Sequence, residues 1–359
     1  MQDFFLSHSY LIGLVSFLLG WLGMPLVIRI AKAKGFVVRP NKRMSHTGEV
    51  PNIGGLNICF SFILSYLLFE YNQLDQNQFF LIGLFAIMAV GFIDDVLVLT
   101  PLAKLIGETL AGIALIGFAD LRITHLHGLF GIGEIGIVPS YLISFFILIA
   151  IINAVNLIDG IDGLASGLGI LYCLFFATYF GLAGDTSWSI LGICMIGALA
   201  VFFIYNVFGR RGKIFMGDSG SLLLGYLLTA FVFHLCEVNA YGEVPAWLHM
   251  KAAPAVSICV LTIPIFDTIR VSITRIKKHR SPFLPDKNHI HHLLLSTGLN
   301  HLQTTCVLLS VSVLFIGLAI LGCNWNMWVL LIADFSLATI LTLLLWRVIN
   351  KKLYGHAEH

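Results

Sequence analysis

The chain has 359 residues, of which 58% are hydrophobic and 11% charged, and its mean hydropathy is +0.91. A soluble domain is about 45–50% apolar and about 25% charged, so the composition excludes an ordinary soluble protein. It indicates an all-α, polytopic membrane protein with one helical domain over 1–359, the lipid bilayer as a partner and no nucleic-acid partner. The net charge of +2 says little by itself, because in membrane proteins the placement of positive residues matters more than their sum.

Apolar runs of roughly 17–22 residues predict about 11 transmembrane helices. The expected spans lie near residues 9–30, 53–69, 79–93, 103–119, 138–157, 163–183, 189–207, 219–236, 252–269, 303–322 and 326–347. An odd number puts the termini on opposite sides. With the N-terminus outside and the C-terminus inside, only Arg122 and Lys251 of the 21 Lys and Arg residues lie outside, and larger inside loops fall near 31–52 and 270–302.

The first polar cluster, Asp94 and Asp95, closes the third expected span. Two adjacent carboxylates at the negative end of a helix are unfavourable unless a cation or a proton offsets them. Lys104, nine residues further on, is the nearest basic side chain in sequence and is placed to face the pair or a phosphate. A solvated helix end is the alternative interpretation.

The second cluster is NAVNLIDGIDGLA, residues 153–165, at the end of the fifth expected span. Asn153, Asn156 and Asp159 recur every three residues and therefore share one helix face. Their oxygens are ligands that Mg²⁺ prefers. Asp162 follows in a turn that leads into the next span. A helix C-cap with an Asx-turn is the alternative, although it leaves the two Asn residues unexplained.

The third cluster, FMGDSGS at residues 215–221, opens the eighth expected span. Asp218 can simply cap this helix. Between Gly217 and Gly220, however, the helix start also offers free backbone N–H groups to an anion such as a phosphate.

The fourth cluster, DKNHIHH at residues 286–292, lies in the last large inside loop. His289, His291 and His292 suggest zinc, but the other candidate ligands are carboxylates and amides rather than Cys, which favours oxygen-ligated Mg²⁺. In a basic loop these histidines are typical of phosphate binding, and a solvated positive-inside face is the alternative. A GxGxxG pattern at Gly131, Gly133 and Gly136 falls outside with no βαβ context, which predicts a turn-rich hairpin rather than a cofactor site.

All four clusters fall on the same expected face, which favours one composite site. A Mg²⁺ and phosphate site at the mouth of a helical bundle suggests an enzyme that joins a soluble phosphorylated donor to a lipid. A divalent-cation transporter is the rival from another class, since membrane carboxylates often mark ion paths. Transporter sites lie near the bilayer midplane, however, whereas these clusters sit at one face, with none at the centre of a span.

Several motifs resemble the polyprenyl-phosphate N-acetylhexosamine-1-phosphate transferase superfamily, glycosyltransferase family 4: HTGEVPNIGG (46–55), GFIDD (91–95) with Lys104, NAVNLIDGIDGLA, FMGDSGS, and PIFDTIRV (264–271) followed by SPFLPDKNHIHHLL (281–294). The resemblance implies transfer of a sugar 1-phosphate from a UDP-N-acetylhexosamine to undecaprenyl phosphate with release of UMP. It also implies Mg²⁺, for which Mn²⁺ can substitute, and a site on the cytoplasmic face of the plasma membrane. A homodimer is compatible with it.

The resemblance also assigns roles. It implies catalytic roles for Asp94, Asp95, Asp159 and Asp162, substrate binding by Lys104, Asn153, Asp267, His289, His291 and His292, and metal binding by Asn156 and Asp218. The spaced HIHH form is similar to the branch that uses UDP-N-acetylglucosamine, whereas the peptidoglycan-precursor branch has three consecutive His. Two features depart from the family pattern: Glu108 replaces a common Gln, and residues 209–212 (GRRG) replace a Pro-Ala pair.

Overall fold

The structure, a computed structural model, describes residues 2–38, 49–209, 212–279 and 288–354, and describes only the backbone of 2–8, 73–76 and 352–354. Residues 46–48 of the first motif, Arg210, Arg211 and most of the segment before His289 therefore lie outside the described residues.

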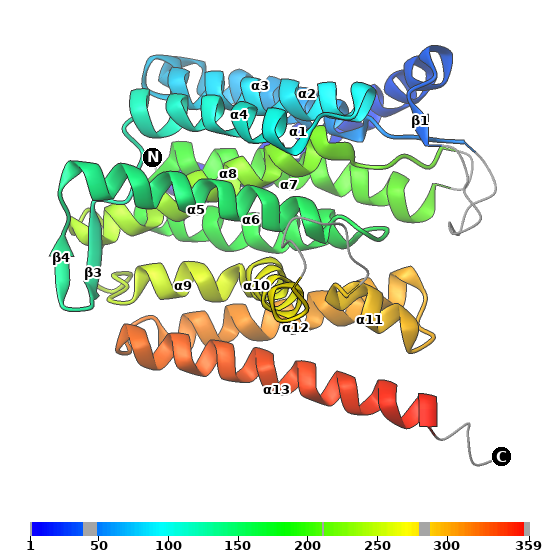
Figure 1. Cartoon of the computed structure of the whole chain (residues 1–359). Helices are drawn as coiled ribbons and strands as arrows, with labels where there is room; N and C mark the ends of the chain where they lie inside the picture. The colour runs from blue at the N-terminus through cyan, green and yellow to red at the C-terminus, as the bar shows by residue number, and fades with distance from the viewer. Residues whose placement is uncertain (1, 39–48, 210–211, 280–287, 355–359) are drawn as a thin grey trace.

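The described chain is a helical bundle with two short hairpins (Figure 1), which confirms the all-α class. The hairpin strands are β1 (Val37–Val38), β2 (Val50–Pro51), β3 (His125–Leu129) and β4 (Ile132–Glu134), and each pair is antiparallel. The helices are α1 (Gln2–Lys34), α2 (Gly54–Glu70), α3 (Leu74–Leu97), α4 (Pro101–Gly112), α5 (Ile137–Ile158), α6 (Leu164–Ala183), α7 (Thr186–Phe208), α8 (Gly217–Ala240), α9 (Ala253–Val260), α10 (Thr262–Lys277), α11 (Ile290–Ser296), α12 (His301–Gly322) and α13 (Met327–Tyr354), with η1 (Tyr71–Gln73) and η2 (Ile113–Phe118) as short irregular helices.

Each span expected from the sequence has a helical counterpart, so the chain is a multi-pass membrane protein. In the described part of the chain, 9 helices are long and apolar enough to cross a membrane, and the bent pair α9 and α10 makes a tenth candidate. The second expected span corresponds to α2, an apolar helix of 17 residues that falls just short of that length.

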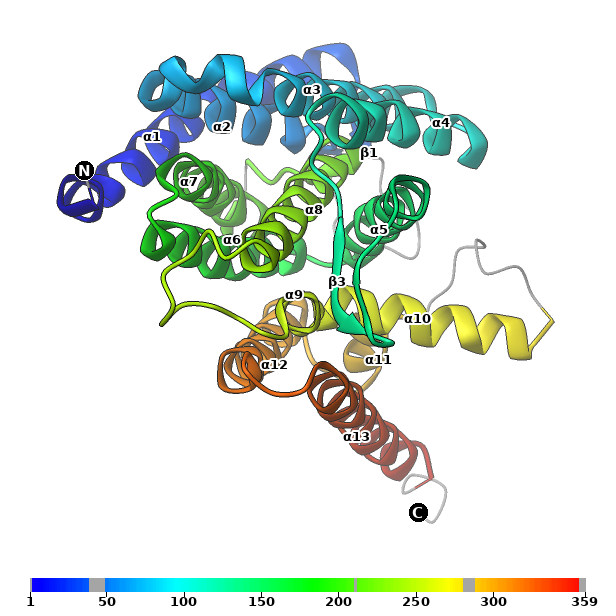
Figure 2. The same ribbon diagram turned by 90° about the vertical axis from the view of Figure 1, so that its left-hand side faces the viewer.

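The ninth expected span differs from the prediction because it is broken. Helices α9 and α10 meet at Leu261 with a bend of 80°, so that α10 projects sideways from the bundle (Figure 2). Pro264 explains the position of the break: it has no N–H to donate to the carbonyl of Val260, but it is tolerated in the first turn of a new helix. Hydropathy alone does not reveal the bend.

Helix α8 forms the centre of the bundle (Figure 2). In its most apolar stretch of 18 residues 89% of the residues are buried, compared with 22% in the corresponding stretch of α13. Close packing at its N-terminus depends on glycine. A Cβ atom added to Gly55 would lie 2.2 Å from the backbone nitrogen of Gly220. Small residues allow such close helix approach in membrane proteins, where apolar contact alone gives little specificity. The central helix thus presents its N-terminus, with Asp218, to the surrounding helix ends.

The GxGxxG segment forms the β3–β4 hairpin and the turn after it, as predicted. It lies at the end of the bundle opposite the β1–β2 hairpin (Figure 1).

Candidate active site

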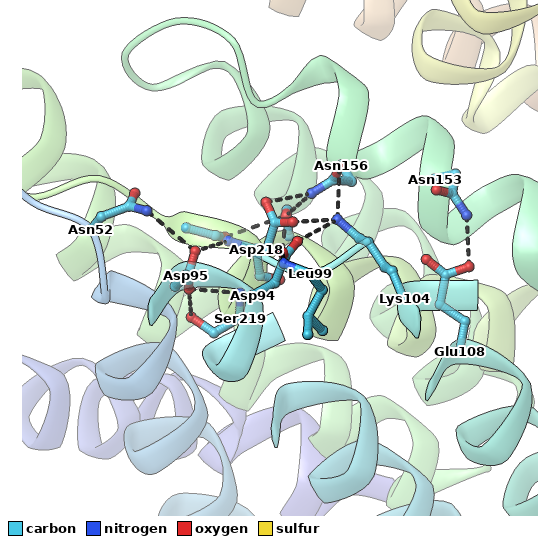
Figure 3. Close-up of polar contacts among 12 residues, drawn as sticks. Asn52, Asp94, Asp95, Leu99, Lys104, Glu108, Asn153, Asn156, Asp218 and Ser219 are labelled. Atoms are coloured by element: carbon cyan, nitrogen blue, oxygen red, sulfur yellow. Dashed lines mark hydrogen bonds and ion pairs between the residues drawn. The ribbon is translucent and has the colours of Figure 1, made fainter. Parts of the chain in front are cut away.

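The site forms where the chain enters α8. Residues before this helix pair with the segment before α2: Phe215 N–H donates to the carbonyl of Pro51 (2.8 Å), Gly54 N–H to Phe215 (3.0 Å) and Gly55 N–H to Met216 (2.8 Å). The C-terminal ends of α3 and α5 and the start of α4 converge on the same point (Figure 3). Three of the sequence clusters therefore meet at the N-terminus of α8.

Asp95 caps α8 with both of its carboxylate oxygens. Oδ1 accepts from the backbone N–H of Asp218 (2.7 Å) and from Asn52 Nδ2 (3.2 Å), while Oδ2 accepts from Ser219 N–H (3.1 Å) and Ser219 Oγ (2.8 Å). The first N–H groups of a helix have no partner within the helix, and a carboxylate there also complements the helix dipole. Asp95 is thus a cap supplied by another helix, and its oxygens are already occupied.

We expect Asp95→Asn to lower the thermal stability of the purified protein. The amide presents an NH₂ group to N–H donors, so at least one buried donor loses its acceptor, at a cost of about 1–3 kcal/mol. The measurement is the Tm in detergent, with Asp120→Asn as the control because the Asp120 side chain is 70% exposed. An unchanged Tm with lost activity would show that Asp95 acts in the chemistry instead.

Lys104 supplies the positive group expected beside Asp94. Its Nζ atom lies 3.3 Å from Asp94 Oδ2, 3.5 Å from Asn156 Oδ1 and in a short contact with Asp218 Oδ2. Asn156 Nδ2 donates to Asp218 Oδ1 (3.0 Å) and to Ser221 Oγ (2.8 Å), which fixes the direction of its amide. Asp94 also accepts from Leu99 N–H (2.5 Å). Oxygens from three helices therefore surround one cation (Figure 3).

This arrangement fits a magnesium ion. Among the described residues, no group of three or more His, Cys, Asp or Glu side chains is placed to hold a metal, so an all-protein zinc cage is absent there. Mg²⁺ needs less, because it is bound through one or two carboxylates and completes its shell with water and substrate phosphates. Oxygens of Asp218, Asn156 and Asp94 converge on one point, which the Lys104 ammonium occupies in this structure.

A cavity of about 630 Å³ opens beside this cluster. It joins the Asp218 region to the turn after α5 and to His292 of the fourth sequence cluster. Its lining includes Asn52, Asn156, Asp159, Asp162, Lys213, Phe215, Asp218, His292 and His301. The structure therefore brings residues from all four sequence clusters to one region, with Asp94 and Asp95 bonded beside Asp218 and with Asp159, Asp162, Asp218 and His292 in the cavity lining.

The two aspartates of the turn after α5 have different environments. Burial raises the pKa of Asp159 to about 7, and the nearby charges of Asp218, Asp95 and Asp162 act in the same direction. Burial also acts to raise the pKa of Asp162, but hydrogen bonds from His301 Nδ1 (2.9 Å) and Lys213 Nζ (2.7 Å) outweigh it and lower that pKa. Asp162 is therefore a fixed anion near neutral pH, whereas Asp159 titrates there.

Sequence reasoning missed Lys213 and His301 as site residues. Lys213 stands two residues before the FMGDSGS motif, with its ammonium 5.6 Å from the ring centre of Phe215, and His301 begins α12. The only sequence signal for Lys213 was its membership of the inside basic residues, and His301 had no signal.

The histidine tract is divided between the cavity and the protein interior. Asp267 is 2% exposed and accepts from His289 Nδ1 (2.9 Å), Ile290 N–H (3.0 Å) and Arg270 Nη2 (2.6 Å). His291 packs against Gly160, where an added Cβ would lie 2.2 Å from Nε2. Burial lowers the pKa of His291 to about 3, and neighbouring His292 adds to this, so its ring is neutral. Of the three histidines, only His292 lines the cavity.

Asn153 lies outside the cavity lining. Its Nδ2 donates to Glu108 Oε2 (2.8 Å) and to the carbonyl of Ile149 (2.9 Å). Glu108 is 1% exposed, and its other oxygen has no partner among the described residues. The structure thus pairs Asn153 with the residue that departs from the family pattern, one helical turn after Lys104 (Figure 3).

The fold and the site define a class: a polytopic helical membrane protein with an acidic cluster around Lys104 and a polar cavity beside it. Residues 77–235 match the family described as glycosyl transferase family 4. The chain is 31% identical over 336 residues to a decaprenyl-phosphate N-acetylglucosaminephosphotransferase of Mycolicibacterium smegmatis, covering 88% of this chain and 82% of that relative.

Similar relatives occur in other bacteria. Undecaprenyl-phosphate alpha-N-acetylglucosaminyl 1-phosphate transferases of Escherichia coli (strain K12) and Yersinia pestis are 28% and 29% identical, covering 86% and 82% of this chain and 84% and 79% of the relatives. The chain belongs to glycosyl transferase family 4.

Proposed function

We propose that this protein transfers N-acetylglucosamine 1-phosphate from UDP-N-acetylglucosamine to undecaprenyl phosphate and releases UMP. An oxygen of the lipid phosphate forms a bond to the β-phosphorus of the donor, and the bond from that phosphorus to the bridging oxygen breaks, so that UMP leaves with that oxygen. The names of the relatives support the sugar phosphate and the polyprenyl phosphate. The observation that carries the proposal is the convergence of Asp94, Asn156 and Asp218 on Lys104 beside a polar cavity.

The cavity has room and partners for the donor. Its volume of about 630 Å³ lies within the range of ordinary ligand pockets. Lys213, His292 and His301 line it with groups able to meet phosphate oxygens, while Phe215 offers a ring to a base. Asp218 and Asn156, with Asp94, would hold Mg²⁺, which when bound neutralises the pyrophosphate and the charge that develops during transfer. We place the donor with its pyrophosphate toward Asp218.

The lipid phosphate needs little activation. The second pKa of a phosphate monoester is about 6, so near neutral pH it is largely a dianion with a nucleophilic oxygen. Lys104 is positioned to hold such an anion in line with the donor, and Asp94 is positioned to take a residual proton. Asp95 is less suited to either task because both of its oxygens cap α8. We therefore favour direct attack by the lipid phosphate over a covalent phosphosugar on an aspartate.

We place the site on the cytoplasmic face of the plasma membrane, with the N-terminus outside. The support is the charge distribution, because basic residues gather in loops on the cytoplasmic side. Lys32 and Lys34 end α1, and Lys277 and Lys278 end α10, while Arg122 belongs to the region of the opposite hairpin. A UDP-sugar is a cytoplasmic metabolite, so this orientation gives the donor access.

The competing functions have less support. The peptidoglycan-precursor branch has three consecutive His, whereas here Ile290 separates His289 from His291. With this spacing the His289 and His291 rings are buried, and His292 lines the cavity. A cation transporter would be expected to hold its site near the bilayer midplane. Here the acidic cluster lies where helices end.

We expect His292→Ala to raise the KM for UDP-N-acetylglucosamine more than the KM for undecaprenyl phosphate. His292 lines the cavity proposed for the donor, and hydrogen bonds to charged phosphates contribute about 1.5–3 kcal/mol. His279→Ala is the matched control, since His279 is exposed beyond the end of α10. An effect confined to the lipid KM would contradict the placement of the donor.

The proposed activity is tested by UMP release from purified protein in detergent. We expect release to require UDP-N-acetylglucosamine, undecaprenyl phosphate and Mg²⁺ together. Release with UDP-N-acetylmuramoyl-pentapeptide instead would favour the peptidoglycan branch. No release with either donor would contradict the transferase assignment.

A further inference from the structure

A second acidic site lies away from the cavity, at the break between α9 and α10. Asp334 belongs to α13, is 0% exposed, and lies inside a candidate membrane span. Its Oδ1 atom is 2.8 Å from Thr262 Oγ1, and its Oδ2 atom has no hydrogen-bond partner among the described residues. The Cys259 thiol is a further neighbour. Ionisable residues within membrane spans are costly and are usually functional.

The hydrogen-bond geometry is best satisfied when Asp334 is uncharged. Thr262 Oγ1 lies 2.8 Å from the carbonyl oxygen of Cys259 as well as 2.8 Å from Asp334 Oδ1. A hydroxyl group carries one proton, and a carbonyl or a carboxylate carries none. If Asp334 is protonated and donates to Thr262, which in turn donates to Cys259, each short contact contains its own hydrogen, whereas a charged Asp334 would have to share the single hydroxyl proton with the carbonyl. No ion pair with Asp334 occurs among the described residues, and burial of an unpaired charge is strongly unfavourable.

Thr262 is the first residue of α10, so this contact joins the break directly to α13. At the bend the N–H of Leu261 still donates to Ser257 (3.2 Å), but Pro264 has no N–H to donate, so contacts with other helices help to fix the direction of α10. Asp334 supplies one at the residue where α10 begins.

The direction of α10 matters for the site because α10 carries Asp267. Asp267 lies five residues after Thr262, or about 7.5 Å along the helix. It binds His289 and the N–H of Ile290 and so holds the start of α11. The His289 ring stacks on His291 with centroids 5.8 Å apart, and His291 packs on Gly160 next to Asp159. A rotation of α10 would therefore displace the wall of the cavity that includes His292.

We propose that Asp334, as an uncharged acid, forms with Thr262 a latch that fixes α10 and thereby positions the histidine tract for the donor. Asp334 is a positioning residue, since it touches neither the cavity nor the reacting groups. The effect on donor use rests on the proposed function, whereas the latch itself does not.

The latch is tested with three variants that should fold. Asp334→Asn keeps the shape and an uncharged hydrogen-bonding group. Asp334→Leu removes the hydrogen bond and puts an apolar side chain in place of the buried carboxyl group, so the variant buries no unpaired charge or carboxyl group at this position. Thr262→Val removes the other partner. Thr342→Val is the matched control, because within the described part of the chain the Thr342 hydroxyl bonds only to its own helix, at Ala338.

The first readout needs no substrate. Spin labels at Ile276 on α10 and Phe146 on α5, both exposed, report the direction of α10 in a Cys306→Ser, Cys323→Ser background. We expect one narrow distance distribution for the wild type, Asp334→Asn and Thr342→Val, and a broader or shifted one for Asp334→Leu and Thr262→Val. An unchanged distribution in both latter variants would overturn the latch.

The second readout is the protonation state of Asp334. Infrared spectra at neutral pH should contain the C=O stretch of a protonated carboxyl group that Asp334→Asn lacks. Its absence from the wild type would show a charged Asp334 and overturn the proposal.

The third readout is kinetic. We expect kcat/KM for UDP-N-acetylglucosamine to fall about tenfold in Asp334→Leu and Thr262→Val, as for the loss of one buried hydrogen bond, and to recover in Asp334→Asn. The double variant Asp334→Leu, Thr262→Val should lose no more than either single variant. An equal loss in Asp334→Asn and Asp334→Leu would show that the acid acts in the chemistry, which contradicts a positioning role. If the wild type releases no UMP while the spin-label distances respond as expected, the proposed function fails and the latch stands.

Discussion

Asp218→Asn should reduce kcat by at least about 10²–10³-fold, as does the loss of one preorganised electrostatic group in other enzymes. The amide keeps the shape of the side chain, but it removes the negative charge that balances Lys104 and that would hold Mg²⁺. Asn156 Nδ2 donates to Asp218 Oδ1, so the amide can still accept this bond, and the helix start is capped by Asp95. The variant should therefore fold.

The rate of UMP release and the Tm together check this prediction. Asp120→Asn again serves as the control for the same chemical change at an exposed position. Activity within a few fold of the wild type at ordinary Mg²⁺ would show that Asp218 has only a structural role at the helix start.

Lys104→Met should have an effect of similar size, about 10²–10³-fold on kcat. Methionine keeps much of the length but removes the cation to which Asp94 and Asp218 are paired. Arg keeps the charge in a larger, planar group, so Lys104→Arg should retain more activity than Lys104→Met.

The comparison of these two variants is the informative measurement, made with both substrates saturating. If Met and Arg give the same rate, the charge of Lys104 does not contribute to the transfer. If Lys104→Met stays within a few fold of the wild type, the acidic cluster has another counterion and the proposed site needs revision.

The positions of the spans and the grouping of the site were predictable from the sequence. Apolar run length follows from the thickness of the bilayer, and every expected span found a helix. The positive group expected near Asp94 is Lys104, because two carboxylates at a helix end require one. Asp159, Asp218 and His292 line one cavity, in agreement with the placement of their clusters on one expected face.

The distinct roles of neighbouring residues were not predictable, because they depend on contacts between distant segments. Asp95 differs from Asp94 only by one position, yet it caps α8, which begins more than 100 residues later. His289 and His291 differ from His292 because Asp267 and Gly160 hold their rings in the interior.

The bend at Leu261 escaped prediction for a similar reason. Pro264 permits the break, but the run of apolar residues continues through it, and hydropathy does not record helix direction. Lys213 and His301 carry no motif and become site residues only through their bonds to Asp162.

The most direct test of the central claim follows the β-phosphorus of the donor. Purified protein is incubated with undecaprenyl phosphate, Mg²⁺ and UDP-N-acetylglucosamine labelled with ³²P in the β-phosphate, and the lipid is extracted. We predict that the label enters the lipid in equal amount to the UMP released, and that it does so with the wild type but not with Asp218→Asn. Label that stays in the aqueous phase as UDP while the sugar enters the lipid would show ordinary glycosyl transfer and would contradict the phosphosugar mechanism proposed for this site.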